Sequence, residues 1–138
     1  MRGIFVGIAV VTAFAGAAFA AGGSLYKTED CSKMMVQMDL NQCAGNNAQS
    51  ADTALNAAYK ALLKQHPDAS SVASLKESEH AWMAYRDREC AREVGPQADG
   101  GSIWPMETSN CLEDKTAARL RELKHSLDCP EGPLACSK

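Results

Sequence analysis

The chain has 138 residues, 22% of them charged, and a formal net charge of −3 at pH 7. The acidic balance and the absence of a basic stripe in the sequence argue against a nucleic-acid partner. This length suffices for one domain around a single core.

Residues 1–20 have the pattern of a secretory signal peptide. Arg2 provides the positive start, residues 4–14 form an apolar run, and Ala18-Phe19-Ala20 is a small-x-small cleavage site. The run is shorter than the roughly twenty residues that a membrane-spanning helix needs. We therefore expect an exported chain, periplasmic or extracellular, that has no membrane anchor after cleavage.

The remaining part of the chain favours helices. It contains seventeen Ala and eleven Leu, but Val, Ile and Thr together make up only eight residues. Ala and Leu have high helix propensity, whereas β-branched residues are typical of strands. Loss of Arg2 also changes the net charge to −4. This composition predicts an all-α fold and argues against a β-sandwich or a barrel.

The first helix is expected over residues 38–65, after an irregular segment at residues 21–37. Gly45-Asn46-Asn47 has low helix propensity and forms the weak part of this helix. Pro67 ends the helix, because the residue before a proline avoids the helical region. Apolar residues recur at the spacing of a buried helical stripe, at Ala51, Leu55, Ala58, Tyr59 and Leu62.

The second helix is expected over residues 70–94, and Gly95-Pro96 ends it. Its apolar positions are Val72, Leu75, Trp82, Met83 and Tyr85. Among these, Trp82 and Tyr85 are expected to have structural roles.

A loop at residues 95–102 leads to the third helix. Ser102 is the expected N-cap. Pro105 then falls in the first turn, where its missing N–H would be unpaired anyway. The buried stripe of this helix is predicted at Met106, Leu112, Thr116, Leu120, Leu123 and Leu127. Three helices joined by short turns predict an elongated antiparallel bundle over residues 38–127.

Six cysteines remain after signal cleavage, and an even number in an exported chain predicts three disulfides. Pairing between sequential neighbours is our prediction among the fifteen possible connectivities, and each bridge would stabilise the fold by about 2–3 kcal/mol. The last bridge would close the tail at residues 128–138 into a small loop. The predicted pairs are Cys31 with Cys43, Cys90 with Cys111, and Cys129 with Cys136.

Arg86 and Arg119 are expected to be half-buried and to fix helix packing. A disulfide between Cys90 and Cys111 would bring their two stretches of chain together. We expect each arginine to pair with Glu79, with Glu89 or with a backbone carbonyl. Buried ion pairs specify geometry more reliably than they stabilise a fold.

No catalytic or metal-binding constellation is recognisable, so neither enzymatic activity nor a cofactor is expected. The three histidines have no evident nucleophile as a partner. Glu77/Glu79 and Asp87/Glu89 are two residues apart and therefore point to different faces of a helix, unlike a glycosidase dyad. The sequence also lacks Cys-x-x-Cys and any Cys/His cluster at zinc-ligand spacing.

Met34, Met35 and Met38 form a local group of thioethers. Such a group could bind Cu(I), which prefers soft sulfur ligands. We favour the alternative that these methionines pack the N-terminal segment against the first helix as flexible gap-fillers.

The segment before the third helix is the best candidate for binding a partner. Glycine allows a close approach of the backbone to another surface, and tryptophan is enriched among interface anchors. The alternative is that the tryptophan folds back onto the bundle and the glycines only turn the chain. The candidate residues are Gly100, Gly101, Ser102, Ile103 and Trp104.

Two motifs stand out together in this sequence. The first is Trp-x-x-Tyr-Arg-Asp-x-Glu-Cys at residues 82–90, and the second is Gly-Gly-Ser-Ile-x-Pro-Met at residues 100–106. Together they resemble the LprI-type lysozyme-inhibitor domain, and the resemblance covers residues 30–124. The resemblance implies a helical, disulfide-bonded domain that is exported to the bacterial envelope. The chain differs from the family pattern in lacking a lipobox cysteine and in adding Cys129 and Cys136 to a four-cysteine core.

The resemblance also implies that the chain binds and inhibits a lysozyme-type glycan hydrolase. Many lysozymes are strongly cationic, so an acidic inhibitor would be steered towards them. Ser102 could bring a hydroxyl to a cleft that contains two carboxylates. The alternatives are an envelope binding or structural protein with another partner, and a copper-binding module that uses the methionines.

Overall fold

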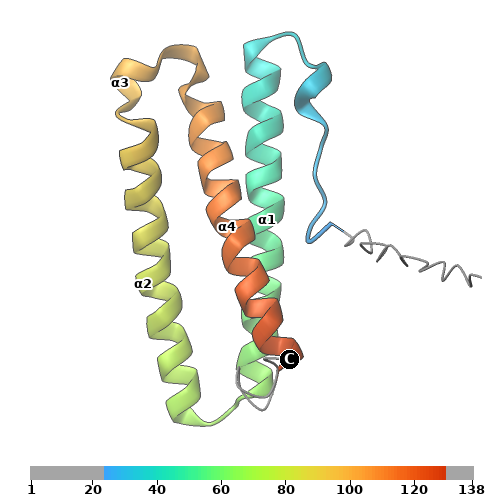
Figure 1. Cartoon of the computed structure of the whole chain (residues 1–138), viewed down its shortest axis with the longest axis vertical. Helices are drawn as coiled ribbons and strands as arrows, with labels where there is room; N and C mark the ends of the chain where they lie inside the picture. Colours follow the sequence, from blue (N-terminus) through green and yellow to red (C-terminus); the bar gives the residue numbers. More distant parts are fainter. Residues whose placement is uncertain (1–23, 130–138) are drawn as a thin grey trace, which may run out of the picture.

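The computed structural model describes residues 24–129, which form an elongated bundle of three long antiparallel helices (Figure 1). The predicted all-α fold and the three-helix architecture are therefore confirmed. The elements in chain order are η1 (Cys31–Lys33), α1 (Gln37–Gln65), α2 (Ala69–Val94), α3 (Gln97–Gly100), η2 (Gly101–Ile103) and α4 (Trp104–Asp128). Within the described range, no helix combines the length and the apolar character needed to cross a membrane.

The predicted bounds of α1 and α2 lie within one residue of the observed ones. The start of α2 is fixed by Asp68, whose carboxylate accepts a hydrogen bond from the backbone N–H of Ser71 at 2.9 Å. This bond, with those from the hydroxyls of Ser71 and Ser70, lowers the pKa of Asp68 to about 2. The sequence analysis did not identify this cap, although an Asp after Pro67 is a typical signal for one.

The prediction of an irregular loop capped by Ser102 is wrong. The segment contains the short helix α3 and the 3₁₀ turn η2, and η2 runs directly into α4. Ile103 is the N-cap of α4, has helical dihedral angles and makes no side-chain capping bond. Because the backbone is already helical before Trp104, no extended capping residue is needed, and Pro105 lies in the first turn as expected.

The apolar core lies between α1 and the C-terminal half of α4. Figure 1 shows α4 between α1 and α2, and α4 packs far more extensively against α1 than against α2. The predicted stripes supply this core, since its buried residues are Leu55, Ala58, Leu62, Leu120 and Leu123.

The segment before η1 runs alongside α1 (Figure 1) and contributes apolar side chains to this core. Leu25 and Tyr26 pack against the core residues. The phenolic O–H of Tyr26 donates a hydrogen bond to Glu113 of α4 at 2.8 Å. Burial raises the pKa of Tyr26 to about 12, and the hydrogen bond to Glu113 and the charge of that carboxylate act in the same direction.

Helix α2 is attached to α4 mainly by covalent and polar contacts. Its buried residues are Glu79 and Cys90, and the apolar side chain of Trp82 is partly buried. Met83 and Tyr85, two of the apolar positions of this helix, are 43% and 55% exposed. Helix α2 packs essentially against α4 alone. The buried face of α2 is therefore narrower than the spacing of its apolar residues suggested.

Arg119 connects the middle of α4 to α2, as predicted. Its Nε donates a hydrogen bond to Oε1 of the buried Glu79 at 2.8 Å, and its Nη2 donates to the same oxygen. Its Nη1 donates to the exposed Glu122 at 2.7 Å, and its Nη2 also reaches the hydroxyl of Ser78. One guanidinium therefore joins the two helices through several directed bonds.

Arg86 is also largely buried, but its partners differ from the prediction. Its guanidinium lies 5.2 Å from the ring centre of Trp82 and pairs with Asp87 at 2.9 Å and with Asp52 of α1 at 3.4 Å. It also contacts the hydroxyl of Thr116 in α4 at 3.4 Å. The helical stripe directs Arg86 across the bundle towards α1 and α4, and therefore away from Glu79 and Glu89.

The predicted pairings Cys31–Cys43 and Cys90–Cys111 are both present, with Cα–Cα distances of 5.9 and 5.7 Å. Cys129 is also disulfide-bonded. Cys136, the tail beyond Cys129 and the predicted signal peptide lie outside the described residues.

Replacement of Glu79 tests the buried ion pair. We expect Glu79→Ala to lower the free energy of unfolding by about 1–3 kcal/mol, because Arg119 loses its buried partner but keeps Glu122. Urea denaturation measures the change. The matched control is Glu122→Ala, whose 63% exposed side chain predicts a loss of about 0.5 kcal/mol. Equal losses for the two variants would contradict this account.

Tyr26 makes the free energy of unfolding depend on pH in the alkaline range. Its pKa is about 12 in the folded chain and about 10 in an unfolded one. Its contribution is therefore complete below pH 10 and is lost as the pH rises through 12. We expect an absorbance titration of wild type to show a late tyrosine transition that Tyr26→Phe removes. A transition that is unchanged in the variant would show that another tyrosine is responsible.

Candidate functional site

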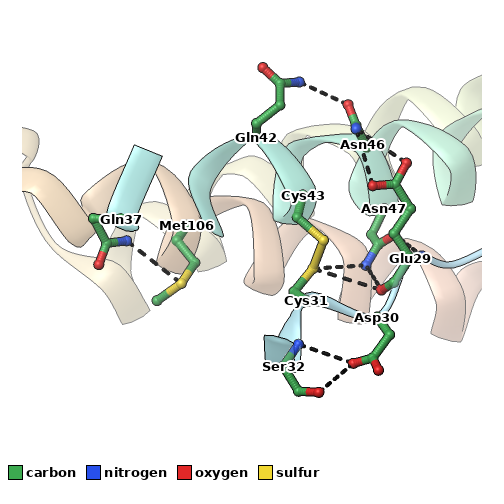
Figure 2. Close-up of a disulfide and its surroundings, with 10 residues drawn as sticks. All are labelled: Glu29, Asp30, Cys31, Ser32, Gln37, Gln42, Cys43, Asn46, Asn47 and Met106. Carbon is green, nitrogen blue, oxygen red and sulfur yellow. Dashed lines mark hydrogen bonds between the residues drawn. A yellow bond between two sulfur atoms is a disulfide. The ribbon is translucent and has the colours of Figure 1, made fainter. Parts of the chain in front are cut away.

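The candidate segment lies at one end of the bundle, where α1 begins, α2 ends and α4 begins (Figure 1). Two side chains of α1 connect to it. Asn41 Nδ2 donates a hydrogen bond to the carbonyl of Ser102 at 3.0 Å, and Gln37 Nε2 lies 3.8 Å from the sulfur of Met106 (Figure 2). We call this surface, residues 30–41 and 95–107, the loop end.

Trp104 folds back onto the bundle, as in the second of the two alternatives for this residue. Its indole N–H donates a hydrogen bond to the carbonyl of Gly95 at 3.0 Å. The ring lines a groove of about 750 Å³ between α2 and α4, together with Thr108 and Leu112. Trp104 therefore fixes the shape of the connection between α2 and α4.

The two glycines are required by the path of the backbone. A β-carbon at Gly100 would lie 2.5 Å from Cδ1 and 2.7 Å from Cβ of Trp104, which is closer than carbon atoms can pack. Gly101 has φ +57°, a conformation that costs little for glycine. Ser102 and Ile103 are exposed, Ile103 to 47%. Of the five candidate residues, these two present side chains that a partner could contact.

Three apolar side chains next to this segment are more exposed than the sequence analysis expected. Met35, Val36 and Met38 are 92%, 54% and 74% exposed, so the packing prediction is wrong for Met35 and Met38. Met34, the third methionine of the group, is partly buried.

The segment before α1 is held by a clamp that the sequence analysis missed. Figure 2 shows the Cys31–Cys43 disulfide beside Asn47, which is 8% exposed. The Asn47 side chain accepts a hydrogen bond from the backbone N–H of Glu29 at 2.6 Å and donates one to its carbonyl at 3.1 Å. Asn47 follows Cys43 and precedes Ala51 by four residues, and a polar residue on a buried stripe was the available signal.

Charge is distributed unequally along the bundle. Among the described residues, the half containing the loop end (24–56 and 82–116) has eleven carboxylates and six Lys or Arg, whereas the other half has five and six. Asp30, Asp39, Asp99 and Glu107 are exposed at the loop end itself, which has a single cation, Lys33, among these described ranges. Hydrogen bonds from the side chain and backbone of Ser32 lower the pKa of Asp30. The loop end is therefore the acidic end of the molecule.

The described residues do not gather a metal site or a histidine-based catalytic group. No three His, Cys, Asp or Glu side chains within residues 24–129 are arranged to hold a metal ion. His66 and His125 belong to the opposite end of the bundle, at the last turns of α1 and α4, and His80 is exposed in the middle of α2.

A pair of glycine replacements tests the geometry of the loop end. We expect Gly100→Ala to lower the free energy of unfolding by about 1–3 kcal/mol, because its methyl group overlaps Trp104. Gly45→Ala is the matched control, since a β-carbon there has no atom within 4 Å, and in a helix it should stabilise by about 0.5–1 kcal/mol. Thermal unfolding measures both. Stabilisation by Gly100→Ala would show that the connection adapts without cost.

Comparison with known proteins identifies the family of this chain. The family model described as "Lysozyme inhibitor LprI" matches residues 28–123. An uncharacterized protein of Rhizobium meliloti (strain 1021) is 37% identical over 114 residues, covering 74% of this chain and 81% of the relative. No solved structure matches the chain. The match over most of the chain, with the helices and the two disulfides described above, places this protein in the LprI lysozyme-inhibitor family.

Proposed function

We propose that this protein is an exported inhibitor that binds a lysozyme-type glycan hydrolase with fixed stoichiometry. The observation that carries the proposal is the family match over residues 28–123. In this role the protein acts through its surface, without catalysis and without a cofactor. The acidic loop end supports the choice of partner, because many lysozymes are cationic and opposite charges accelerate association.

Ser102 and Ile103 are the proposed contact residues in the candidate segment. A hydroxyl can donate a hydrogen bond to a carboxylate, and lysozyme-type enzymes use a pair of carboxylates in their cleft. Gly100, Gly101 and Trp104 contribute indirectly, since they determine where the two contact side chains stand. A rigid segment of this kind loses little conformational entropy on binding.

We expect this fold to form after the chain has been exported from the cytoplasm. Disulfides persist in oxidising compartments such as the periplasm and the cell exterior, and the described residues contain Cys31–Cys43 and Cys90–Cys111. Residues 1–20, as a cleaved signal peptide, would deliver the chain to either compartment.

Two alternatives have different outcomes in simple assays. An envelope binding or structural protein with another partner would leave lysozyme activity unchanged. A copper-binding module would show a Cu(I) titration that differs between wild type and a triple replacement of Met34, Met35 and Met38. The exposed thioethers of Met35 and Met38 are the feature on which the copper hypothesis depends.

Replacement of the two contact residues tests the proposed site. We expect Ser102→Ala/Ile103→Ala to weaken inhibition of a c-type lysozyme by about tenfold or more, since both side chains contact the enzyme. A turbidity assay with bacterial cell walls measures inhibition by purified oxidised protein.

Met83→Ala is the matched control, because this residue is similarly exposed on α2, outside the loop end. We expect the double variant and the control to unfold at the same temperature as wild type. Full inhibition by the double variant would exclude this segment as the site, whereas no inhibition by wild type of any lysozyme class would refute the proposed function.

A further inference from the structure

Three neighbouring apolar side chains at the loop end are more than half exposed in the described structure. We propose that Met35, Val36 and Met38, which we call the methionine ridge, form the apolar half of the interface with a cationic glycan hydrolase. This inference rests on the proposed function and adds a second contact surface to Ser102 and Ile103.

The exposed large apolar side chains are concentrated at the loop end. Six large apolar side chains are exposed among the described residues, and four of them, the three of the ridge and Ile103, belong to the loop end. Exposed apolar groups of this kind mark interaction sites in soluble proteins. Methionine is also enriched at interfaces, where its flexible thioether fits an irregular partner surface.

The ridge is held in position on both sides. On its N-terminal side, the Cys31–Cys43 disulfide and the Glu29–Asn47 hydrogen bonds attach the chain to α1 (Figure 2). On its C-terminal side, the carbonyl of Val36 accepts hydrogen bonds from the backbone N–H groups of Asp39 and Leu40 in α1, at 3.1 Å each. The ridge therefore presents its side chains from a fixed backbone, which lowers the entropic cost of binding.

The surrounding charge selects the type of partner. Exposed carboxylates of Asp30, Asp39, Asp99 and Glu107 belong to the same end as the ridge. A second copy of this chain, docked ridge to ridge, would bring two acidic ends together and repel itself. A cationic protein with apolar groups at the rim of its cleft complements both the charge and the apolar surface.

The test uses the full mature protein with all its disulfides formed. We expect Met35→Gln/Met38→Gln to raise the Kd for a c-type lysozyme about tenfold or more, measured by calorimetry, because two apolar contacts are replaced by amides that stay hydrated. The unfolding temperature should not change, since both side chains are in solvent in the free protein. Met83→Gln is the matched control and should bind as wild type does.

The other outcomes separate the two proposals. If wild type inhibits and the double variant binds equally well, the ridge is not part of the interface and the proposed function stands. If wild type binds no lysozyme, both proposals are overturned. If sedimentation shows a wild-type dimer that the double variant abolishes, a second copy covers the ridge and the inference is wrong.

Discussion

The two observed disulfides determine the geometry of the loop end, where the bundle has little apolar core. The buried leucines lie towards the other end, between α1 and the C-terminal half of α4. Around the loop end, the buried residues include Cys43, Cys90 and Cys111 of the two bridges and the small side chains of Ala44 and Ala51. Covalent links thus replace the packing that large apolar side chains supply elsewhere, as expected for small exported domains.

Because the disulfides, rather than apolar packing, hold the loop end together, this end can expose apolar side chains and keep its structure. A surface that relied on Met35 or Met38 for packing could not present them to a partner. The clamp formed by Cys31–Cys43 and Asn47 fixes the backbone independently of these side chains. The residues that stabilise this segment are therefore different from those proposed to contact a partner.

Most of the fold could be predicted from the sequence, because it follows from local signals. Helical spacing of Leu and Ala, together with Pro67 and Gly95, located α1 and α2 almost to the residue. Sequential cysteine pairing was correct for the two bridges between described residues. The pairing of Arg119 with Glu79 was also anticipated.

The errors concern features that depend on which surfaces meet. Tyr85 has the spacing of a packing residue, but α2 has essentially one neighbour and leaves this side chain in solvent. Asp52 could not be chosen as a partner of Arg86, because the two residues lie on different helices whose rotation the sequence does not specify. At the candidate site, the glycines and Trp104 were recognisable as special, but only the contact of the indole with Gly95 distinguishes a fixed turn from a protruding anchor.

The attachment of α2 has a consequence for the compartment in which the chain can remain intact. With Cys90 and Cys111 reduced, this helix would be retained by Arg86, Arg119, the Lys115–Glu93 ion pair and a few partly buried apolar side chains. Such a helix would detach before the α1–α4 pair unfolds, and proteases cleave detached segments first. A chain left in a reducing cytosol would thus be removed, and intact molecules would accumulate only where the bridge can form.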